Sequence, residues 1–378
     1  MIDTEGNIVK QMSLNEIVSN PKAPDFKQNY HTILNEKEGD RKRARQNWNT
    51  IQNIKELKEG YMSQVVHIIC QLMLEYDAIV VLENLNRSFM QIRGGIEKSV
   101  YQKFEKMLID KLGYIVDKEK PINENGGALH AVQLADTFSN FGLIKDSLVK
   151  QCGFIFYVPA WCTSKIDPTT GFVSLIKSKY ENINTSKAFF EKFESIRYDE
   201  NEQYFVFETD FSKFRTSSLG GKQIWNICTF GDRILTERSK EHNSMFVSTT
   251  ISLTQEWIKL MEQYGINYKG NIKAQIMQRD EKPFFEALHK LLRLTLQMRN
   301  SNSQTQEDFI ISPVKNSSGE FFDSRKGDES LPIDADANGA FNIARKGLML
   351  MQQIDNTPEG EKFKPEIKNE TWLEFAQK

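Results

Sequence analysis

The sequence has few cysteines, and they are scattered. Its 378 residues contain only Cys70, Cys152, Cys162 and Cys228, with no C-x-x-C pair and no histidine at the spacing of a zinc site. We therefore expect a protein of a reducing compartment, without a disulfide framework and without bound zinc.

Targeting and membrane signals are also missing. The N-terminal residues show no basic segment followed by an apolar one, and no apolar stretch approaches the ~20 residues that a membrane span needs. With 39% hydrophobic residues and a mean hydropathy of −0.51, the chain is expected to be soluble, globular and cytoplasmic, with no membrane partner.

Net charge of one sign is nearly absent. Lys and Arg number 49 and Asp and Glu 51, so the formal charge is −2. This balance excludes binding to nucleic acid through bulk positive charge alone, and any polyanion would have to be held by local patches.

The first half of the chain alternates between strand and helix patterns. Three- and four-residue periodicity predicts one long helix, or two in succession, between Ile51 and Tyr76, and a continuous apolar run over 77–82 is typical of a strand buried on both faces. Further patterns predict helices over 100–112 and 133–150 and strands over 114–116 and 153–158. A turn at residues 3–7 indicates a short hairpin with only two residues before it. This alternation favours an open α/β sheet flanked by helices.

The pattern changes after Pro159. We expect a loop over 163–171, an antiparallel hairpin over 197–207, a strand over 223–230, and helices over 254–264 and 282–298, which together suggest an inserted α+β domain. Residues 300–306, rich in Ser, Asn and Gln, have the composition of a linker. An alanine-rich helix follows from Asp334.

Three carboxylates stand at positions that can carry chemistry. Glu83 ends a predicted strand, where α/β proteins place functional groups, although a polar residue leaving a sheet is the commoner explanation. Asp334 and Asp336 begin a helix, where acidic residues are common caps. Together they match what a divalent-metal phosphodiesterase requires. In that reading Asn338 could position a ligand or substrate, and 339–340 leave room for its close approach.

The sequence then resembles a known family almost from end to end. It is similar to the C-terminal part of the type V-A CRISPR-associated effectors, RNA-guided DNA endonucleases with a single RuvC-like active site. The resemblance rests on the segments 49–64, 80–86, 100–112, 157–160, 163–168, 296–301, 322–325 and 334–340.

The resemblance implies an RNase H-like (RuvC) mixed sheet with flanking helices, lacking its first strand and interrupted by an α+β Nuc domain. The implied boundaries are 1–46 for a partial RuvC segment, 47–64 for the bridge helix, 65–156 for RuvC, 157–333 for the Nuc insertion and 334–378 for the last RuvC segment.

Site residues follow by matching motifs. Glu83 and Asp336 correspond to the second and third RuvC carboxylates and would bind Mg²⁺, with Mn²⁺ as a possible substitute. Arg299 matches the Nuc-domain arginine that the family needs for cleavage, and a guanidinium binds phosphate in a bidentate fork. Asp308 matches an acidic position of the same domain. A solvated charge at a helix end is the alternative for Arg299.

A basic stretch precedes a tryptophan in the implied bridge helix. Arg41, Lys42, Arg43 and Arg45 would face nucleic-acid backbone near the guide–target duplex, with a solvated helix face as the alternative. Trp48 matches the anchor that inserts into the recognition lobe, with an ordinary core tryptophan as its alternative.

The sequence also departs from the family pattern. The Gly-Ile-Asp-Arg-Gly-type motif with the first catalytic aspartate is absent, as are the segments that form the recognition lobe. Two hypotheses therefore stay open. The chain is an Mg²⁺-dependent nuclease region that, with crRNA and the N-terminal lobe, hydrolyses target and non-target DNA strands, or it is an inactive fragment that binds nucleic acid or complements a separate N-terminal piece.

Overall fold

The computed structural model describes two compact units. The first unit comprises residues 10–160, and the second comprises residues 1–9 and 161–378. The residues described are 1–13, 16, 43, 54–84, 95–112, 119–121, 151–152, 155–214, 221–238, 246–302, 305, 307–358 and 366–378.

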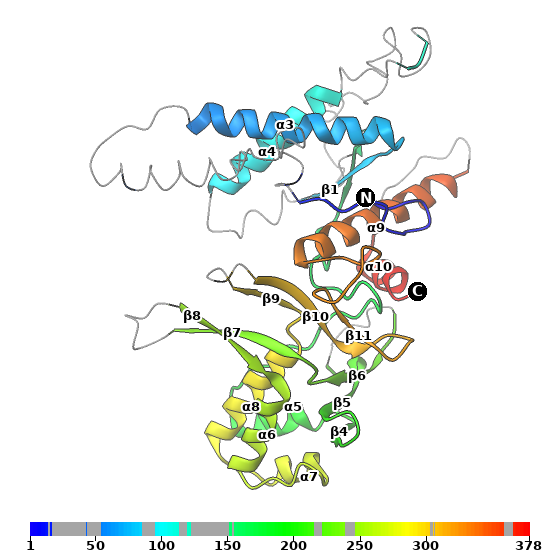
Figure 1. The fold of residues 1–378 in the computed structure, drawn as a ribbon. Helices are drawn as coiled ribbons and strands as arrows, with labels where there is room; N and C mark the ends of the chain where they lie inside the picture. The colour runs from blue at the N-terminus through cyan, green and yellow to red at the C-terminus, as the bar shows by residue number, and fades with distance from the viewer. Residues whose placement is uncertain are drawn as a thin grey trace. The chain divides into compact units, whose positions relative to one another are not determined.

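In the described part of the first unit, two helices lie with a small mixed sheet (Figure 1). Strand β1 is parallel to β3, with Val80 opposite Ile155 and Glu83 opposite Val158, and β2 is antiparallel to β3. The parallel pair confirms the predicted α/β character of this region. Its elements are α3 (Ile54–Glu75), β1 (Val80–Glu83), α4 (Gly95–Leu112), β2 (Gln151–Cys152) and β3 (Ile155–Val158).

The core of the first unit lies between these helices and β3. Lys103 of α4 forms an ion pair with Glu59 of α3. The prediction that residues 77–82 form a strand buried on both faces is wrong for β1, whose four residues are each partly exposed. Within the described residues β1 pairs with β3 alone. The described core cluster consists of Val66, Cys70, Met73, Leu108, Leu112, Ile155 and Tyr157.

Several predictions fall on residues outside the described part of the chain. These are the strand over 114–116, the helix over 133–150, Arg41, Lys42, Arg45 and Trp48. Arg43 is described, and it is helical and exposed.

The second unit contains the predicted hairpin, strand and helices, each within a few residues of the expected bounds. Its strands are β4 (Ser195–Asp199), β5 (Tyr204–Asp210), β6 (Ile224–Cys228), β7 (Asp232–Arg238), β8 (Phe246–Ser252), β9 (Arg299–Asn302), β10 (Glu307–Lys315) and β11 (Phe321–Asp323). Its helices are α5 (Ile183–Phe190), η4 (Phe211–Phe214), α6 (Leu253–Gln263), α7 (Ile272–Met277), α8 (Lys282–Thr295), α9 (Ala335–Asp355) and α10 (Asn369–Ala376).

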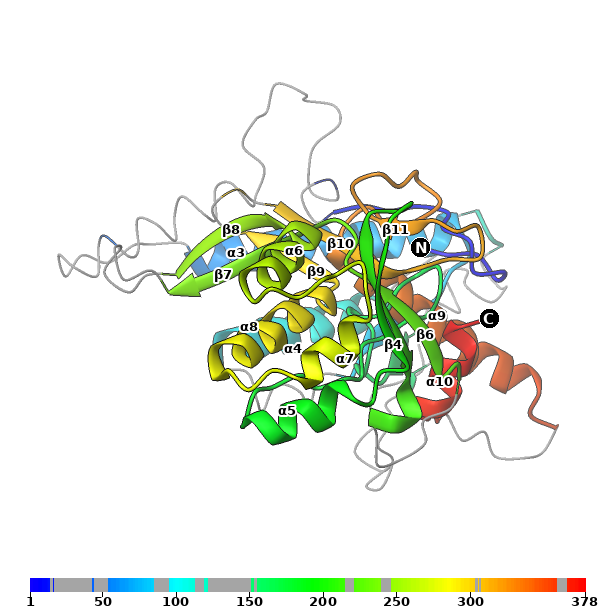
Figure 2. The same cartoon turned by 90° about the horizontal axis from the view of Figure 1, so that it is seen from below.

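The strands of this unit form three antiparallel groups. Their orders are β4-β5-β6, β9-β10-β11 and the ribbon β7-β8. Figures 1 and 2 show α5, α6, α7 and α8 gathered beside these strands. The core that they enclose is rich in aromatic residues, among them Phe205, Phe207, Trp257, Phe284 and Phe285. At the start of the chain, an antiparallel bridge joins Ile2 to Ile8 across the predicted turn.

Contacts of the 161–168 segment fix the two C-terminal helices within the unit. The side-chain amide of Asn338 donates to the carbonyl of Ile166 at 3.0 Å, and the ammonium of Lys346 donates to the carbonyl of Trp161 at 2.6 Å. The indole of Trp372 in α10 donates to the carbonyl of Cys162 at 3.2 Å. The first turn of α9 is therefore held against the predicted loop over 163–171, which the structure confirms as irregular.

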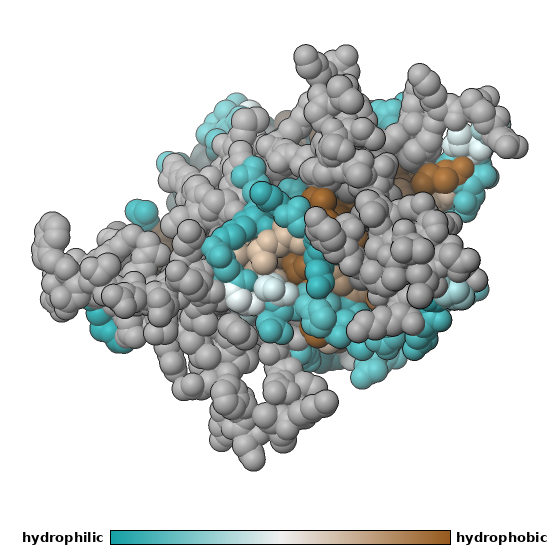
Figure 3. All heavy atoms as spheres, turned by 90° about the horizontal axis from the view of Figure 1, so that it is seen from above, coloured by the Kyte–Doolittle hydropathy of each residue, from teal (hydrophilic) through white to brown (hydrophobic). Residues whose placement is uncertain are grey.

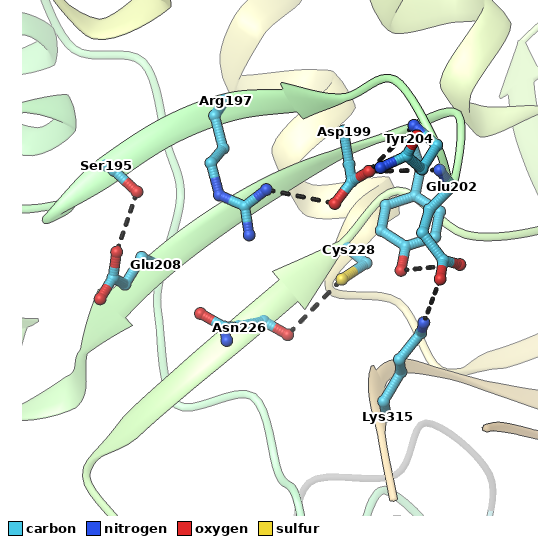
Figure 4. A network of polar contacts seen from close by, with 10 residues as sticks. Ser195, Arg197, Asp199, Glu202, Tyr204, Glu208, Asn226, Cys228 and Lys315 are labelled. Carbon is cyan, nitrogen blue, oxygen red and sulfur yellow. Dashed lines mark hydrogen bonds and ion pairs between the residues drawn. The ribbon is translucent and has the colours of Figure 1, made fainter. Parts of the chain in front are cut away.

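A polar network ties the β4–β5 hairpin to β10 (Figure 4). Glu202, in the turn of the hairpin, lies 3.1 Å from the Lys315 ammonium and accepts a hydrogen bond from the Tyr204 hydroxyl at 3.4 Å. Arg197 and Asp199 pair along β4 at 3.3 Å. One strand of the β9–β10 pair is thus linked to the neighbouring sheet.

The linker expected at 300–306 is wrong for its first three residues, which belong to β9. Asn300 is fully buried, and its side-chain oxygen accepts from the backbone N–H of Ile234 at 2.9 Å while its amide donates to the carbonyl of Met298. Polar composition is misleading here because the side chain of Asn300 forms its hydrogen bonds inside the protein.

The face of the molecule in Figure 3 mixes hydrophilic and hydrophobic patches among the described residues. None of the helices in the described part of the chain is both long enough and apolar enough to span a membrane.

Candidate active site

Asp336 is presented by the first turn of α9. The helix begins there because Asp334 takes an extended backbone conformation and its carboxylate accepts a hydrogen bond from the N–H of Ala337 at 2.7 Å. The predicted acidic cap is therefore confirmed. Asp336 lies two residues further on, and its side chain is 82% exposed. One aspartate serves the helix, and the other is available for chemistry.

Arg299 and Asp308 come from neighbouring strands. In the β9–β10 register Arg299 lies opposite Ile310 and Asp308 opposite Ser301, so the two side chains are diagonal neighbours on one face. The Arg299 Nε donates to Asp308 Oδ1 at 3.2 Å and its Nη2 donates to Oδ2 at 2.7 Å. This bidentate pair fixes the plane of the guanidinium.

The same guanidinium reaches Asp336. Arg299 Nη2 lies 3.0 Å from Asp336 Oδ1, so a single arginine joins β9, β10 and the start of α9. The structure thus brings together three of the four residues that the sequence identifies as catalytic: Arg299, Asp308 and Asp336.

The electrostatics of this cluster follow from partial burial and from its excess of carboxylates. Burial raises the pKa of Asp308, and the charges of Asp336 and Asp334 add to this, while the Arg299 hydrogen bond opposes them. Burial disfavours the charged form of Arg299, but the hydrogen bond and charge of Asp308, together with Asp336, outweigh it and raise the Arg299 pKa. The guanidinium therefore stays charged.

Glu83 belongs to the first unit, at the C-terminal end of β1. Its carbonyl accepts a hydrogen bond from the Tyr101 hydroxyl of α4 at 2.9 Å, and the N–H of the next residue, Asn84, donates to the carbonyl of Val158 at 2.8 Å. Burial raises the pKa of Tyr101, and the charges of Glu105 and Glu83 raise it further. The backbone at Glu83 is thus fixed from both α4 and β3.

Two expectations for the start of α9 need correction. Asn338 is fully buried and donates to the Ile166 carbonyl, so its side chain faces the 163–168 loop instead of a ligand or substrate. Gly339 is buried against the same loop, because a Cβ there would lie 3.8 Å from the Cβ of Ser164. The space beside Gly339 is therefore filled by the protein's own chain, whereas Ala340 is exposed.

The contact that sequence reasoning missed is the Arg299–Asp336 ion pair. It joins a strand and a helix that are separated in the sequence by β10 and β11. In addition, the linker-like composition of 300–306 did not predict strand β9. Matching positions to a family supplies the residues but does not supply this geometry.

Carboxylate oxygens are the donors that Mg²⁺ and Mn²⁺ prefer, so Asp336 and Glu83 fit a divalent cation by their chemistry. Asp308 and Asp334 fit less well, because both oxygens of Asp308 face Arg299 and Asp334 caps the helix. Across the described ranges, no group of three or more His, Cys, Asp or Glu residues forms a ready metal site.

A strand-end glutamate, a helix-start aspartate and a positioned guanidinium are features of the class of domains that act on phosphate esters. A family model described as the RuvC nuclease domain matches residues 1–378. The chain belongs to the RuvC nuclease domain family. This membership indicates nuclease activity and a nucleic-acid substrate.

Proposed function

We propose that this chain is the nuclease region of an RNA-guided DNA endonuclease of the type V-A CRISPR effectors, hydrolysing phosphodiester bonds with Mg²⁺. The single observation that carries the catalytic part is the Arg299 guanidinium, which Asp308 orients and which contacts Asp336. Family membership over residues 1–378 and the order of the matching motifs support the wider assignment.

In this proposal Asp336 and Glu83 are the metal ligands. Bound Mg²⁺ would lower the pKa of a water molecule and neutralise charge on the scissile phosphate. Asp336 suits the role because its carboxylate is largely exposed. Glu83 suits it because it stands at the C-terminal end of a parallel strand.

Arg299 would bind the phosphate. Its Nε and Nη2 face Asp308, and Nη2 also reaches Asp336, while Nη1 adds two more N–H donors. Asp308 would act through Arg299 as a positioning residue, because a bidentate carboxylate holds the guanidinium plane. No covalent step is required of either residue.

The wider proposal assigns the remaining segments. Residues 1–46, 65–156 and 334–378 would form an RNase H-like RuvC domain, 47–64 the bridge helix and 157–333 the Nuc insertion. Arg41, Lys42, Arg43 and Arg45 would contact nucleic-acid backbone, Trp48 would anchor in the recognition lobe, and crRNA and that lobe would be the partners for cleavage of target and non-target strands.

The proposal is tested by incubating the purified chain with labelled single-stranded DNA and Mg²⁺ or Mn²⁺. We expect cleavage that EDTA stops, and we expect Asp336→Ala and Glu83→Ala each to reduce it by about 100-fold or more, because even changes to residues that only hydrogen-bond to metal ligands cost about 10- to 100-fold. Arg299→Ala should also abolish most cleavage.

Asp328→Asn is the matched control, because Asp328 is an exposed aspartate whose partner is the nearby Ser330. Metal-dependent cleavage that survives Asp336→Ala or Glu83→Ala would refute the assignment. Binding without cleavage by the unaltered chain would favour the inactive, nucleic-acid-binding alternative.

A further inference from the structure

The ribbon formed by β7 and β8 is a two-stranded element of the second unit. Its register places Arg238 opposite Phe246 and Thr236 opposite Ser248, so these four residues share one face. Glu237 lies opposite Val247, and Leu235 opposite Thr249, on the other face. Figure 1 shows the ribbon beside β9.

The face that carries Glu237 is attached to the body of the unit. Glu237 pairs with Lys290 of α8 at 2.7 Å, and Leu235 and Ile251 pack against the aromatic core. On the Arg238 face, the base is also covered, because Ile234 is buried with Phe309 and Ile311. The rest of that face, toward Arg238 and Phe246, is the part left to solvent.

Phe246 is 60% exposed, although burial of a phenylalanine is worth roughly 1.5–3 kcal/mol. The Cζ atom of Arg238 lies 5.2 Å from the centre of its ring, within the range of a cation–π contact. In the described ranges Arg238 takes part in no ion pair, whereas Glu237 beside it is neutralised by Lys290. The face therefore presents a positive charge next to an aromatic surface.

Two hydroxyl groups extend this surface along the ribbon. The Thr236 and Ser248 side chains are hydrogen-bonded to each other at 2.9 Å, two cross-strand pairs further from the tip, which is the next pair on the same face. Each hydroxyl can both donate and accept, so the pair has capacity left for a phosphate oxygen or a base edge.

We propose that this face of the ribbon, defined by Thr236, Arg238, Phe246 and Ser248, binds single-stranded nucleic acid. An unpaired base stacks on the Phe246 ring, and Arg238 contacts a phosphate. The proposal rests on the proposed function in that it takes nucleic acid as the substrate. A single strand is favoured over a duplex because only unpaired bases expose a face for stacking.

This contact is distinct from the chemistry at Arg299. Arg299 and Asp308 lie on the β9–β10 face that includes Ile310, whereas Phe309, which packs with Ile234 of the ribbon, is on the opposite face. The ribbon therefore contributes to binding of the strand and makes no contact with the reacting phosphate.

The test measures fluorescence anisotropy of a labelled 20-nucleotide oligothymidylate with the full chain in EDTA, where no hydrolysis occurs. We expect Phe246→Ala to weaken binding at least about fivefold, the loss of roughly one stacked base, and Phe246→Trp to retain it. Arg238→Gln should weaken binding and lower the slope of log affinity against log salt by about one.

Ile224→Ala is the matched control, because Ile224 is also 60% exposed but lies on β6. The proposal is overturned if the unaltered chain does not bind the oligonucleotide, or if Phe246→Ala binds it as Ile224→Ala does. It is also overturned if Phe246→Ala weakens the binding of a duplex of the same length equally, or if Phe246→Ala instead abolishes self-association in sedimentation.

Failure of the proposed function has a different signature. If the unaltered chain binds oligothymidylate in a Phe246-dependent way but cleaves nothing in Mg²⁺ or Mn²⁺, the catalytic proposal fails and the ribbon assignment stands. If it cleaves DNA and Phe246→Ala changes neither binding nor KM, the reverse holds.

Discussion

The two units differ in how firmly they hold their candidate catalytic residues. In the second unit, Arg299 lies on β9 and Asp308 on β10, and Ile310 and Ile311 of β10 are fully buried. An aromatic-rich core supports these strands. In the first unit, Glu83 ends a four-residue strand that is partly exposed throughout. Rigid support for chemistry thus comes from core residues beside a site as much as from the site itself.

The described cores show the same contrast in composition. Tyr157 is the one aromatic side chain in the described core cluster of the first unit, whereas the second unit buries many phenylalanines and two tryptophans in its main core. Large aromatic side chains remove more area from water, so we expect the second unit to be the more stable of the two.

The largest effect should come from breaking the aromatic core. Trp257 is 1% exposed and its indole donates to the Thr295 hydroxyl at 3.1 Å, so Trp257→Ala should lower the free energy of unfolding by about 3–5 kcal/mol. Amide hydrogen exchange should accelerate in α6 and α8. Leu108→Ala is the counterpart in the first unit. It should lower the free energy of unfolding by about 2–5 kcal/mol and accelerate exchange in α3 and α4. Unchanged exchange in α8 after Trp257→Ala would contradict this account of the core.

A smaller effect should appear as pH dependence of stability. His289 is buried between Ser178 and Ser186, 2.8 and 3.1 Å from its ring nitrogens. Burial, and then the charge of Arg293, lowers the pKa of His289 to about 4. In the unfolded chain this histidine takes up a proton near pH 6.5, whereas in the folded protein it stays neutral until the pH approaches 4. The stabilisation from neutral, buried His289 is therefore complete above pH 6.5 and is lost as the pH falls toward 4, about 3 kcal/mol of the free energy of unfolding in all.

Urea titrations between pH 7 and pH 4 measure this loss. His289→Gln should be less stable at pH 7 and should flatten the pH dependence, whereas His67→Gln, at an exposed position of α3, should leave it as in the unaltered chain. An unaltered slope in His289→Gln would show that other groups cause the acid sensitivity.

The smallest effect should be the coupling between Arg299 and Asp308. Their side chains are 38% and 28% exposed, so water screens the pair, and a double-mutant cycle with Arg299→Ala and Asp308→Ala should give about 0.5–1 kcal/mol of coupling in the free energy of unfolding. Cleavage should respond far more strongly than stability. A coupling of several kcal/mol would mean that the pair serves mainly to hold the fold.

Sequence patterns predicted most of the regular elements because their signals are local. The helix from Asp334, the hairpin over 197–207 and the strand at 155–158 follow from caps and periodicity, and the structure confirms them. The burial of β1 and the strand at 300–302 could not be predicted, because both depend on which distant segments pair with them.

The candidate site divides in the same way. Residue types and motif order identified Arg299, Asp308 and Asp336, but their joining by one guanidinium depends on the β9–β10 register and on the place where α9 begins. The roles of Asn338 and Gly339 were mistaken because the sequence does not reveal that the 163–168 loop covers them.

The proposed function makes Glu83 and Asp336 ligands of divalent metal ions. It is tested most directly by calorimetric titration of the full chain with Mn²⁺. We predict that Glu83→Gln and Asp336→Asn each weaken Mn²⁺ binding at least about tenfold, while Asp328→Asn binds as the unaltered chain does. Mn²⁺ binding that is unchanged in either Glu83→Gln or Asp336→Asn would contradict the account.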